Sequence, residues 1–291
     1  MSDNKYHQTY HQQASNSAQN GDEPRHTGTV ENRLKYSGYM IDLDGTVYRG
    51  RERIPEAKDF VERLQKAQIP FLFLTNNTTK SPAAVCKNLA ENHDIHATPE
   101  QVYTPSLATA AWIQQDCGGD AHGHSVYVIG EIGLKQAMLD VGLTFNEFDP
   151  EYVVVGLDYD VTYHKFELAT LAIQRGGKFI GTNADTNLPN ERGHVPGAGS
   201  VIALVERSTQ QKAFYIGKPE KIIMEQGLRR MGLARDEVVM VGDNYKTDIQ
   251  AGINANIDQL LVYTGISTHE FVAAQKIQPT HQVESLADWE V

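Results

Sequence analysis

The sequence predicts an α/β protein in which one parallel-sheet unit is interrupted by a second α/β unit. Three observations lead to this prediction. Residues 70–74 (PFLFL) form a continuous apolar run, as expected of a strand buried on both faces of a parallel sheet. Strand-like and helix-like segments alternate along the chain, which is typical of sheets covered by helices on both faces. Polar clusters follow four of the predicted strands or lie beside them, where open α/β sheets bind ligands.

The first predicted elements follow a segment of different composition. Residues 1–35 are rich in Gln, Asn, Ser and His and have few aliphatic side chains. Such a segment cannot bury enough apolar surface to offset the entropy cost of ordering, so a disordered tail is expected. The elements expected after the tail are strands at 39–41, 70–74 and 101–103 and helices at 57–67 and 82–92.

The middle of the chain repeats the alternation with elements of its own. Its apolar runs are short and lie between helix-like segments, and a Gly/Pro-rich loop at 196–199 precedes the last helix of this block. The elements expected here are strands at 125–129, 152–155 and 178–181 and helices at 134–140, 166–174 and 201–207.

The last third of the chain returns to buried-strand character. Strands are expected at 213–216, 238–241 and 259–262, separated by helices near 220–231 and 247–252. This nested order predicts a discontinuous core domain, residues 36–103 plus 204–291, and an inserted α/β domain at 104–203.

Charge and composition exclude several classes of function. The chain has 291 residues, of which 40% are hydrophobic and 22% charged, as is ordinary for a globular protein. The formal charge of −11 argues against nucleic acid or an anionic membrane as a partner, because both are bound by basic patches. No apolar run is long enough to span a membrane, and the N-terminus lacks the apolar segment of a secretory signal. A cytoplasmic protein is expected, with Cys86 and Cys117 as free thiols.

Four polar clusters carry the candidate chemistry. They are DLDGT at 42–46, TNN at 75–77, GKP at 217–219 and GDNYKTD at 242–248. Any one of them could be an ordinary loop or turn. Because ligands in open α/β sheets bind at the carboxyl ends of the strands, four clusters in that position would converge in space. Their convergence predicts a functional site.

Asp42 and Asp44 leave the first strand on the same side of the backbone, since side chains alternate along a strand. A carboxylate pair suits a hard cation with oxygen ligands, and Mg²⁺ is the common choice near phosphate. For this pair alone, the alternatives are a solvated turn, a sugar-nucleotide site or a calcium loop. A calcium loop would need further acidic positions, which Val47 and Tyr48 do not supply.

The other clusters add groups that handle an anion. Thr75 and Asn76 offer a hydroxyl and backbone N–H groups, and Lys218 offers a compact ammonium. Asp243 adds a third carboxylate, and Asp248 closes the set. Two like charges about 4 Å apart repel by about 4 kcal/mol at an effective dielectric constant near 20. Three carboxylates and a phosphate dianion would therefore require both Mg²⁺ and Lys218.

In this order and spacing, the clusters resemble the four motifs of the haloacid dehalogenase (HAD) superfamily. The words IDLDGTVY at 41–48, GTNAD at 181–185 and PGAGS at 196–200 resemble its 4-nitrophenyl-phosphatase-like branch, subfamily IIA. The resemblance covers residues 37–285. It implies a Rossmann-like parallel-sheet core with an α/β cap domain inserted between the second and third motifs. It also implies a Mg²⁺-dependent phosphatase that hydrolyses small phosphomonoesters, of the nucleotide, sugar phosphate or 4-nitrophenyl phosphate type.

The resemblance implies a role for each matching residue. Asp42 would attack phosphorus and form an aspartyl-phosphate, and Asp44 would protonate the leaving alcohol and later activate water. Thr75, Asn76 and Lys218 would bind the phosphoryl group. Superfamily dehalogenases lack an acid at the position of Asp44 and transport ATPases carry Thr there, so Asp44 favours phosphatases and phosphomutases.

A metal site is implied in the same way. The Asp42 carboxylate, the Asp44 backbone carbonyl and Asp243 would hold Mg²⁺, and Asp248 would bind or orient its waters. In the cap, Asn183 and Asp185 would lie in a loop that faces the substrate, although a plain β-turn is the alternative for both.

The expected partner is a small phosphorylated metabolite. Cap-mediated homodimers occur in the branch, and the sequence leaves the oligomeric state open. Two alternatives to a phosphatase remain. A phosphomutase would return the phosphoryl group to a second hydroxyl, which a large cap that admits water disfavours. A non-catalytic phosphate-binding protein would have an eroded motif, whereas all four motifs are intact.

Overall fold

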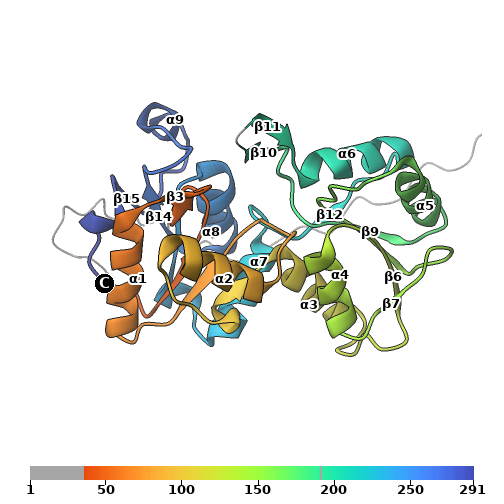
Figure 1. The fold of residues 1–291 in the computed structure, drawn as a ribbon, viewed down its shortest axis with the longest axis horizontal. Helices are drawn as coiled ribbons and strands as arrows, with labels where there is room; N and C mark the ends of the chain where they lie inside the picture. The colour runs from red at the N-terminus through yellow and green to blue at the C-terminus, as the bar shows by residue number, and fades with distance from the viewer. Residues whose placement is uncertain (1–35, 191) are drawn as a thin grey trace, which may run out of the picture. The chain divides into compact units, whose positions relative to one another are not determined.

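The computed structural model of the chain describes residues 36–190 and 192–291. The disordered tail predicted for residues 1–35 lies outside them. Within the described residues, no helix is long and apolar enough to cross a membrane. The structure contains two parallel sheets, of six and five strands, with helices packed on both faces of each (Figure 1). The predicted α/β fold class is therefore confirmed.

The larger sheet contains six parallel strands. They are β1 (Gly38–Ile41), β4 (Phe71–Leu74), β5 (Val102–Tyr103), β13 (Val238–Gly242), β14 (Asp258–Val262) and β15 (His281–Val283). Their order across the sheet is β15-β14-β13-β1-β4-β5. Ile41, the last residue of β1, pairs with Val241 of β13 and Phe73 of β4. The segments that follow these three central strands therefore begin at the same edge of the sheet.

Alternate residues of the central strands face different helical layers. Met40 packs in a core with Met224 of α7 (Lys221–Met231). Its neighbour Ile41 packs in another core with Phe60 of α1 (Pro55–Lys66) and Leu89 of α2 (Pro82–His93). Strands covered on both faces must be apolar throughout, which explains why β1, β4 and β13 are buried along their whole length. The helices around this sheet are α1 (Pro55–Lys66), α2 (Pro82–His93), α7 (Lys221–Met231), α8 (Gln250–Ala255) and α9 (His269–Ala273).

The second sheet lies between β5 and β13 in the sequence. Its strands are β6 (Ser125–Ile129), β7 (Thr144–Phe145), β8 (Tyr152–Val155), β9 (Lys178–Gly181) and β12 (Phe214–Tyr215), and their order is β12-β9-β8-β6-β7. Helices α5 (Tyr163–Gln174) and α6 (Ala198–Thr209) pack on one face, and α3 (Pro105–Asp116) and α4 (Ile132–Asp140) on the other. Because α3 also contacts α7, the apolar core on this side continues into the larger sheet.

Two short hairpins complete the strands. β2 (Tyr48–Arg49) pairs with β3 (Glu52–Arg53), and β10 (Asn187–Asn190) pairs with β11 (Gly193–Pro196). A π-helical turn, Tyr245–Ile249, leads directly into α8. Such turns are rare and occur frequently at functional sites.

The structure differs from the predicted boundary between the two units at residues 203 and 204. Helix α6 continues to Thr209, and β12 pairs with β9, so residues 204–216 lie with the second sheet and not with the core. The physical reason is that β12 has only two residues at a sheet edge, where Phe214 stays exposed. Its apolar character therefore does not reveal which sheet it joins. The behaviour of the two units as separate domains stays a prediction.

Candidate functional site

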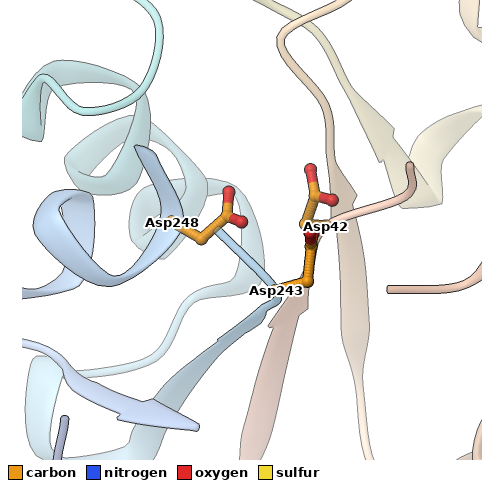
Figure 2. Close-up of side chains that lie close together, drawn as sticks. All are labelled: Asp42, Asp243 and Asp248. Atoms are coloured by element: carbon orange, nitrogen blue, oxygen red, sulfur yellow. The ribbon is translucent and has the colours of Figure 1, made fainter. Parts of the chain in front are cut away.

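Three buried carboxylates gather at the edge of the larger sheet (Figure 2). Asp42 follows β1, Asp243 follows β13, and Asp248 lies in the π-helical turn. One carboxylate oxygen from each residue lies within 4.8 Å of the others. Because β1 and β13 are neighbours in the sheet, their ends bring together residues that are far apart in the sequence.

Lys218 supplies a positive charge to this cluster. It follows β12 and is only 1% exposed. Its Nζ donates to Asp42 Oδ1 at 2.5 Å, to Asp248 Oδ1 at 2.7 Å and to the Leu74 carbonyl at 2.8 Å. A lysine ammonium has three N–H donors, so all of them are used. Lys218 thus connects the segments that follow β1, β4 and β13.

The charges of the cluster do not balance by themselves. Burial, together with the charge of Asp248, raises the pKa of Asp243 to about 7. Burial and the same neighbour also raise the pKa of Asp42, which Lys218 only partly offsets. Burial alone would lower the pKa of Lys218, but Asp248 and Asp42 outweigh it and raise this pKa. In an isolated ion pair the pKa of the carboxyl group would fall, whereas here the pKa values of both Asp42 and Lys218 rise. The reason is that one ammonium is shared among three buried carboxylates.

A divalent cation would restore the balance. Three carboxylates and one ammonium leave two net negative charges when all are ionised. The donor atoms are oxygens, which hard divalent cations prefer. The residues present therefore fit such a cation.

Thr46, Gly265 and Ile266 hold Asp243 in place, and sequence reasoning gave none of them a role. Thr46 Oγ1 lies 3.2 Å from Asp243 Oδ1, and the Ile266 N–H donates to Asp243 Oδ2 at 2.7 Å. A Cβ atom at Gly265 would overlap the Asp243 carboxylate. The same is true of Gly45, whose φ of 96° is a backbone conformation that favours glycine. Residues 265–266 could have been found from the sequence because they follow the strand β14, which pairs with β13 in the sheet.

The loop after β4 carries Thr75 and Asn76. Thr75 Oγ1 accepts a hydrogen bond from the Asn77 N–H at 3.1 Å, which leaves its O–H proton to donate elsewhere. The Asn76 carboxamide is engaged with the backbone of Lys218. Its Oδ1 accepts from the Lys218 N–H, and its Nδ2 donates to the Lys218 carbonyl, both at 2.9 Å.

Asn183 and Asp185 reach the same loop from the segment after β9. Asn183 Nδ2 donates to the Asn76 carbonyl at 2.9 Å. The two carboxylate oxygens of Asp185 accept from Asn76 Nδ2 at 3.1 and 3.2 Å. Burial raises the pKa of Asp185, and the hydrogen bond from Asn76 partly offsets this rise. The structure therefore brings both residues against the TNN cluster.

Asp44 stands apart from the other carboxylates. Its side chain is exposed and accepts a hydrogen bond from the Gly50 N–H at 3.4 Å. Partial burial nevertheless raises its pKa, while Gly50 and His93 act in the opposite direction. A raised pKa lets a carboxyl group keep its proton to a higher pH than an ordinary Asp, which favours a role as a proton donor.

A cavity of about 1400 Å³ opens beside these residues. Its wall includes apolar side chains of the second unit, such as Leu157 and Leu188. Small-molecule sites usually enclose about 300–1,000 Å³, so the cavity can admit a small organic phosphate. All of the predicted site residues line it, namely Asp42, Asp44, Thr75, Asn76, Asn183, Asp185, Lys218, Asp243 and Asp248.

The raised pKa of Asp243 predicts that the metal-free protein loses stability as the pH rises. Between about pH 4 and pH 7 the folded protein keeps a proton that the unfolded chain, with an ordinary Asp pKa of 3.8, has released. Raising the pH through this range therefore lowers the free energy of unfolding. In EDTA, the thermal unfolding midpoint should fall by about 5 °C between about pH 5 and pH 8. Asp243→Asn should reduce this dependence, and an equal fall in that variant would contradict the assignment.

Two family models match the chain. One, described as haloacid dehalogenase-like hydrolase, matches residues 39–144, and a second, HAD-hydrolase-like, matches residues 215–289. Together the two matches include the DLDGT, TNN, GKP and GDNYKTD clusters.

Named relatives and solved structures resemble the chain over most of its length. It is 49% identical to the 5'-nucleotidase YutF of Bacillus subtilis, over 87% of this chain and 97% of that protein. It is 47% identical to an acid sugar phosphatase of Staphylococcus epidermidis, over 86% of this chain and 95% of that protein. The structure of a double mutant of a thermostable NPPase from Geobacillus stearothermophilus superposes with a TM-score of 0.81 at 48% identity, covering 88% of this chain and 98% of that one. NagD from E. coli K-12 superposes with a TM-score of 0.82 at 27% identity, covering 88% of this chain and 99% of that one.

Proposed function

The chain belongs to the haloacid dehalogenase-like hydrolase family, and we propose that it hydrolyses small phosphomonoesters with Mg²⁺ bound beside Asp42. Family membership confirms the resemblance drawn from the four motifs, including the 4-nitrophenyl-phosphatase-like branch. It also confirms the prediction of a hydrolase of the phosphatase class. The identity of the metal, the roles of the residues and the substrates are parts of the proposal.

One observation carries the proposal. Asp42 lies at the wall of the cavity, 2.5 Å from the Lys218 ammonium, with one oxygen within 4.8 Å of carboxylate oxygens of Asp243 and Asp248. A carboxylate next to both an ammonium and a cation site has nearby both of the positive charges that a phosphoryl group needs. It can therefore attack phosphorus while the negative charge of the phosphoryl oxygens is neutralised.

The reaction then proceeds in two steps. Asp42 attacks phosphorus, the bond to the leaving oxygen breaks, and Asp44 protonates that oxygen. Water then attacks phosphorus in the aspartyl-phosphate while Asp44 accepts its proton. The bond between phosphorus and the Asp42 oxygen breaks, which releases inorganic phosphate and regenerates the Asp42 carboxylate. The raised pKa of Asp44 supports its role as the acid.

The proposed Mg²⁺ ligands are the Asp42 carboxylate, the Asp44 backbone carbonyl and Asp243, with Asp248 orienting bound waters. The ion supplies positive charge that the cluster lacks, and so lowers the repulsion between Asp42 and an incoming phosphate dianion. Thr46 and Ile266 support Asp243 by orienting its carboxylate.

The substrates we propose are small phosphorylated metabolites of the nucleotide or sugar phosphate type. The named relatives are a 5'-nucleotidase and an acid sugar phosphatase. The cavity of about 1400 Å³ is large enough for either class. Its walls combine the charged cluster with apolar residues from the second unit, which we propose acts as the cap that selects the leaving group.

Metal removal tests the proposal. Dialysis against EDTA should lower the hydrolysis of 4-nitrophenyl phosphate at least about a hundredfold, because loss of the ion removes several kcal/mol of charge stabilisation. Addition of Mg²⁺ should restore the rate. Full activity in EDTA would contradict metal dependence. With a hexose phosphate as substrate, release of inorganic phosphate indicates hydrolysis, whereas formation of an isomeric hexose phosphate would indicate a phosphomutase.

A further inference from the structure

We infer that the side chain of Asn76 is a positioning group that holds Lys218, and that Asp185 fixes Asn76 from the second unit. This inference rests on the proposed function, because it concerns how Lys218 is aimed at Asp42. It changes the role implied for Asn76 by resemblance, in which this residue binds the phosphoryl group.

The hydrogen-bonding capacity of the Asn76 carboxamide is already used. A carboxamide has two N–H donors and one acceptor oxygen. Nδ2 donates to the Lys218 carbonyl and to the Asp185 carboxylate, and Oδ1 accepts from the Lys218 N–H. A phosphoryl oxygen would have to displace one of these partners. The group of Asn76 left for phosphate is its backbone N–H, which has no hydrogen-bond partner within residues 36–190 and 192–291.

These bonds fix Lys218 at both ends of its own backbone. A lysine side chain is a flexible four-carbon stem, so fixing its backbone limits the positions that the ammonium can take. The neighbouring glycine shows how closely the segments approach. A Cβ atom at Gly217 would lie 2.9 Å from Asn76 Oδ1 and 2.7 Å from the Thr182 carbonyl. The turn at 217–218 is therefore packed directly against the Asn76 carboxamide.

The second unit forms hydrogen bonds with Asn76 at two points. Asn183 Nδ2 donates to its backbone carbonyl, and Asp185 accepts from its side chain. Asp185 is itself held, because its N–H donates to Asn183 Oδ1 at 3.1 Å. A continuous path of hydrogen bonds thus runs from Asp185 through Asn76 and Lys218 to Asp42.

The decisive experiment is a double-mutant cycle between Asn76→Ala and Lys218→Met, measured as kcat and KM for 4-nitrophenyl phosphate. Asn76→Ala alone should lower kcat about a hundredfold, as expected when a charged group is misplaced by about 1 Å. Its KM should change less than about threefold. In the Lys218→Met background, the same change should cost less than about threefold, because no ammonium remains to be positioned. If the two losses multiply, the Asn76 side chain acts independently of Lys218 and the inference is wrong.

A second cycle tests Asp185. Asp185→Ala should lower kcat about tenfold in the wild-type background and less than about twofold beside Asn76→Ala. Asp185→Asn keeps an acceptor oxygen and should lose less activity than Asp185→Ala. Equal losses in both backgrounds would overturn the role of Asp185. This cycle, run against Lys218→Met, also decides the matter if Asn76→Ala does not fold.

Asn88→Ala serves as the matched control, because the Asn88 side chain accepts a hydrogen bond from Asn92 on α2, away from the candidate site. Its kcat should equal that of the wild type. Failure of the proposed function is distinguishable from failure of this inference. In the first case the wild-type protein itself releases no phosphate in Mg²⁺. In the second case it does release phosphate, and the losses of kcat in the two single variants multiply in the double variant.

Discussion

Asp42→Asn is expected to abolish the hydrolysis of 4-nitrophenyl phosphate, lowering kcat at least about a thousandfold. Asn has nearly the same shape as Asp, and its Oδ1 can still accept the hydrogen bond that Lys218 donates at 2.5 Å. The geometry of the site should therefore persist. A neutral amide, however, is a poor nucleophile and cannot form an aspartyl-phosphate, so the covalent route is closed.

Stability and activity should respond differently to this change. Asp42→Asn removes one of three mutually repelling carboxylates. The thermal unfolding midpoint of the metal-free variant should therefore be no lower than that of the wild type. Asp120→Asn makes the same chemical change on an exposed turn, where the Asp120 carboxylate is hydrogen-bonded to His122, and should keep the wild-type rate. Residual activity of the Asp42 variant above about one thousandth of the wild-type rate would exclude Asp42 as the nucleophile.

The strands of both sheets could be predicted because burial on both faces leaves a continuous apolar run. The predicted strands at 125–129, 152–155 and 178–181 have the bounds of β6, β8 and β9. Helix α1 could be predicted because its buried residues Ala57, Phe60, Val61 and Leu64 recur at helical spacing.

Other elements lack such a signal. Helix α3 (Pro105–Asp116) is buried on several sides between α4 and α7, so its small residues, such as Ala108 and Thr109, show no apolar stripe. The hairpins β2–β3 and β10–β11 have strands of two to four residues, too short for a period to be visible. For β12, the choice of sheet depends on a partner strand, β9, and not on its own residues.

The convergence of the site residues could be predicted from their positions after strands. The expected reason, that all the clusters follow strands of one sheet, holds for only some of them. Asp42, Thr75 and Asp243 follow neighbouring strands of one sheet. Lys218 instead follows β12 of the second sheet and enters the cluster from the other unit. The engagement of Asn76 depends on partners more than a hundred residues away in the sequence, which no local pattern reveals.

Lys218→Met is expected to lower kcat about a thousandfold, because it removes the ammonium that contacts Asp42 and that we propose stabilises the transferring phosphoryl group. Met nearly matches Lys in length, so the change deletes charge and hydrogen bonds more than volume. It also leaves the buried Asp42 and Asp248 carboxylates without their cation and the Leu74 carbonyl without its donor. Removing one partner of a buried ion pair typically costs about 3–5 kcal/mol of stability.

The two losses can be separated by pH and metal. The thermal unfolding midpoint of the Lys218 variant should approach that of the wild type at low pH, where the raised pKa of Asp42 lets this carboxylate take up a proton, whereas kcat should not recover. Lys212→Met removes a lysine whose side chain is 87% exposed and paired with Glu206, and should change neither quantity appreciably. If saturating Mg²⁺ restored the activity of the Lys218 variant, its ammonium would serve only to balance the carboxylates. A loss that persists in saturating Mg²⁺ would indicate that the Lys218 ammonium acts on the phosphoryl group itself, a role that the proposed Mg²⁺ cannot take over.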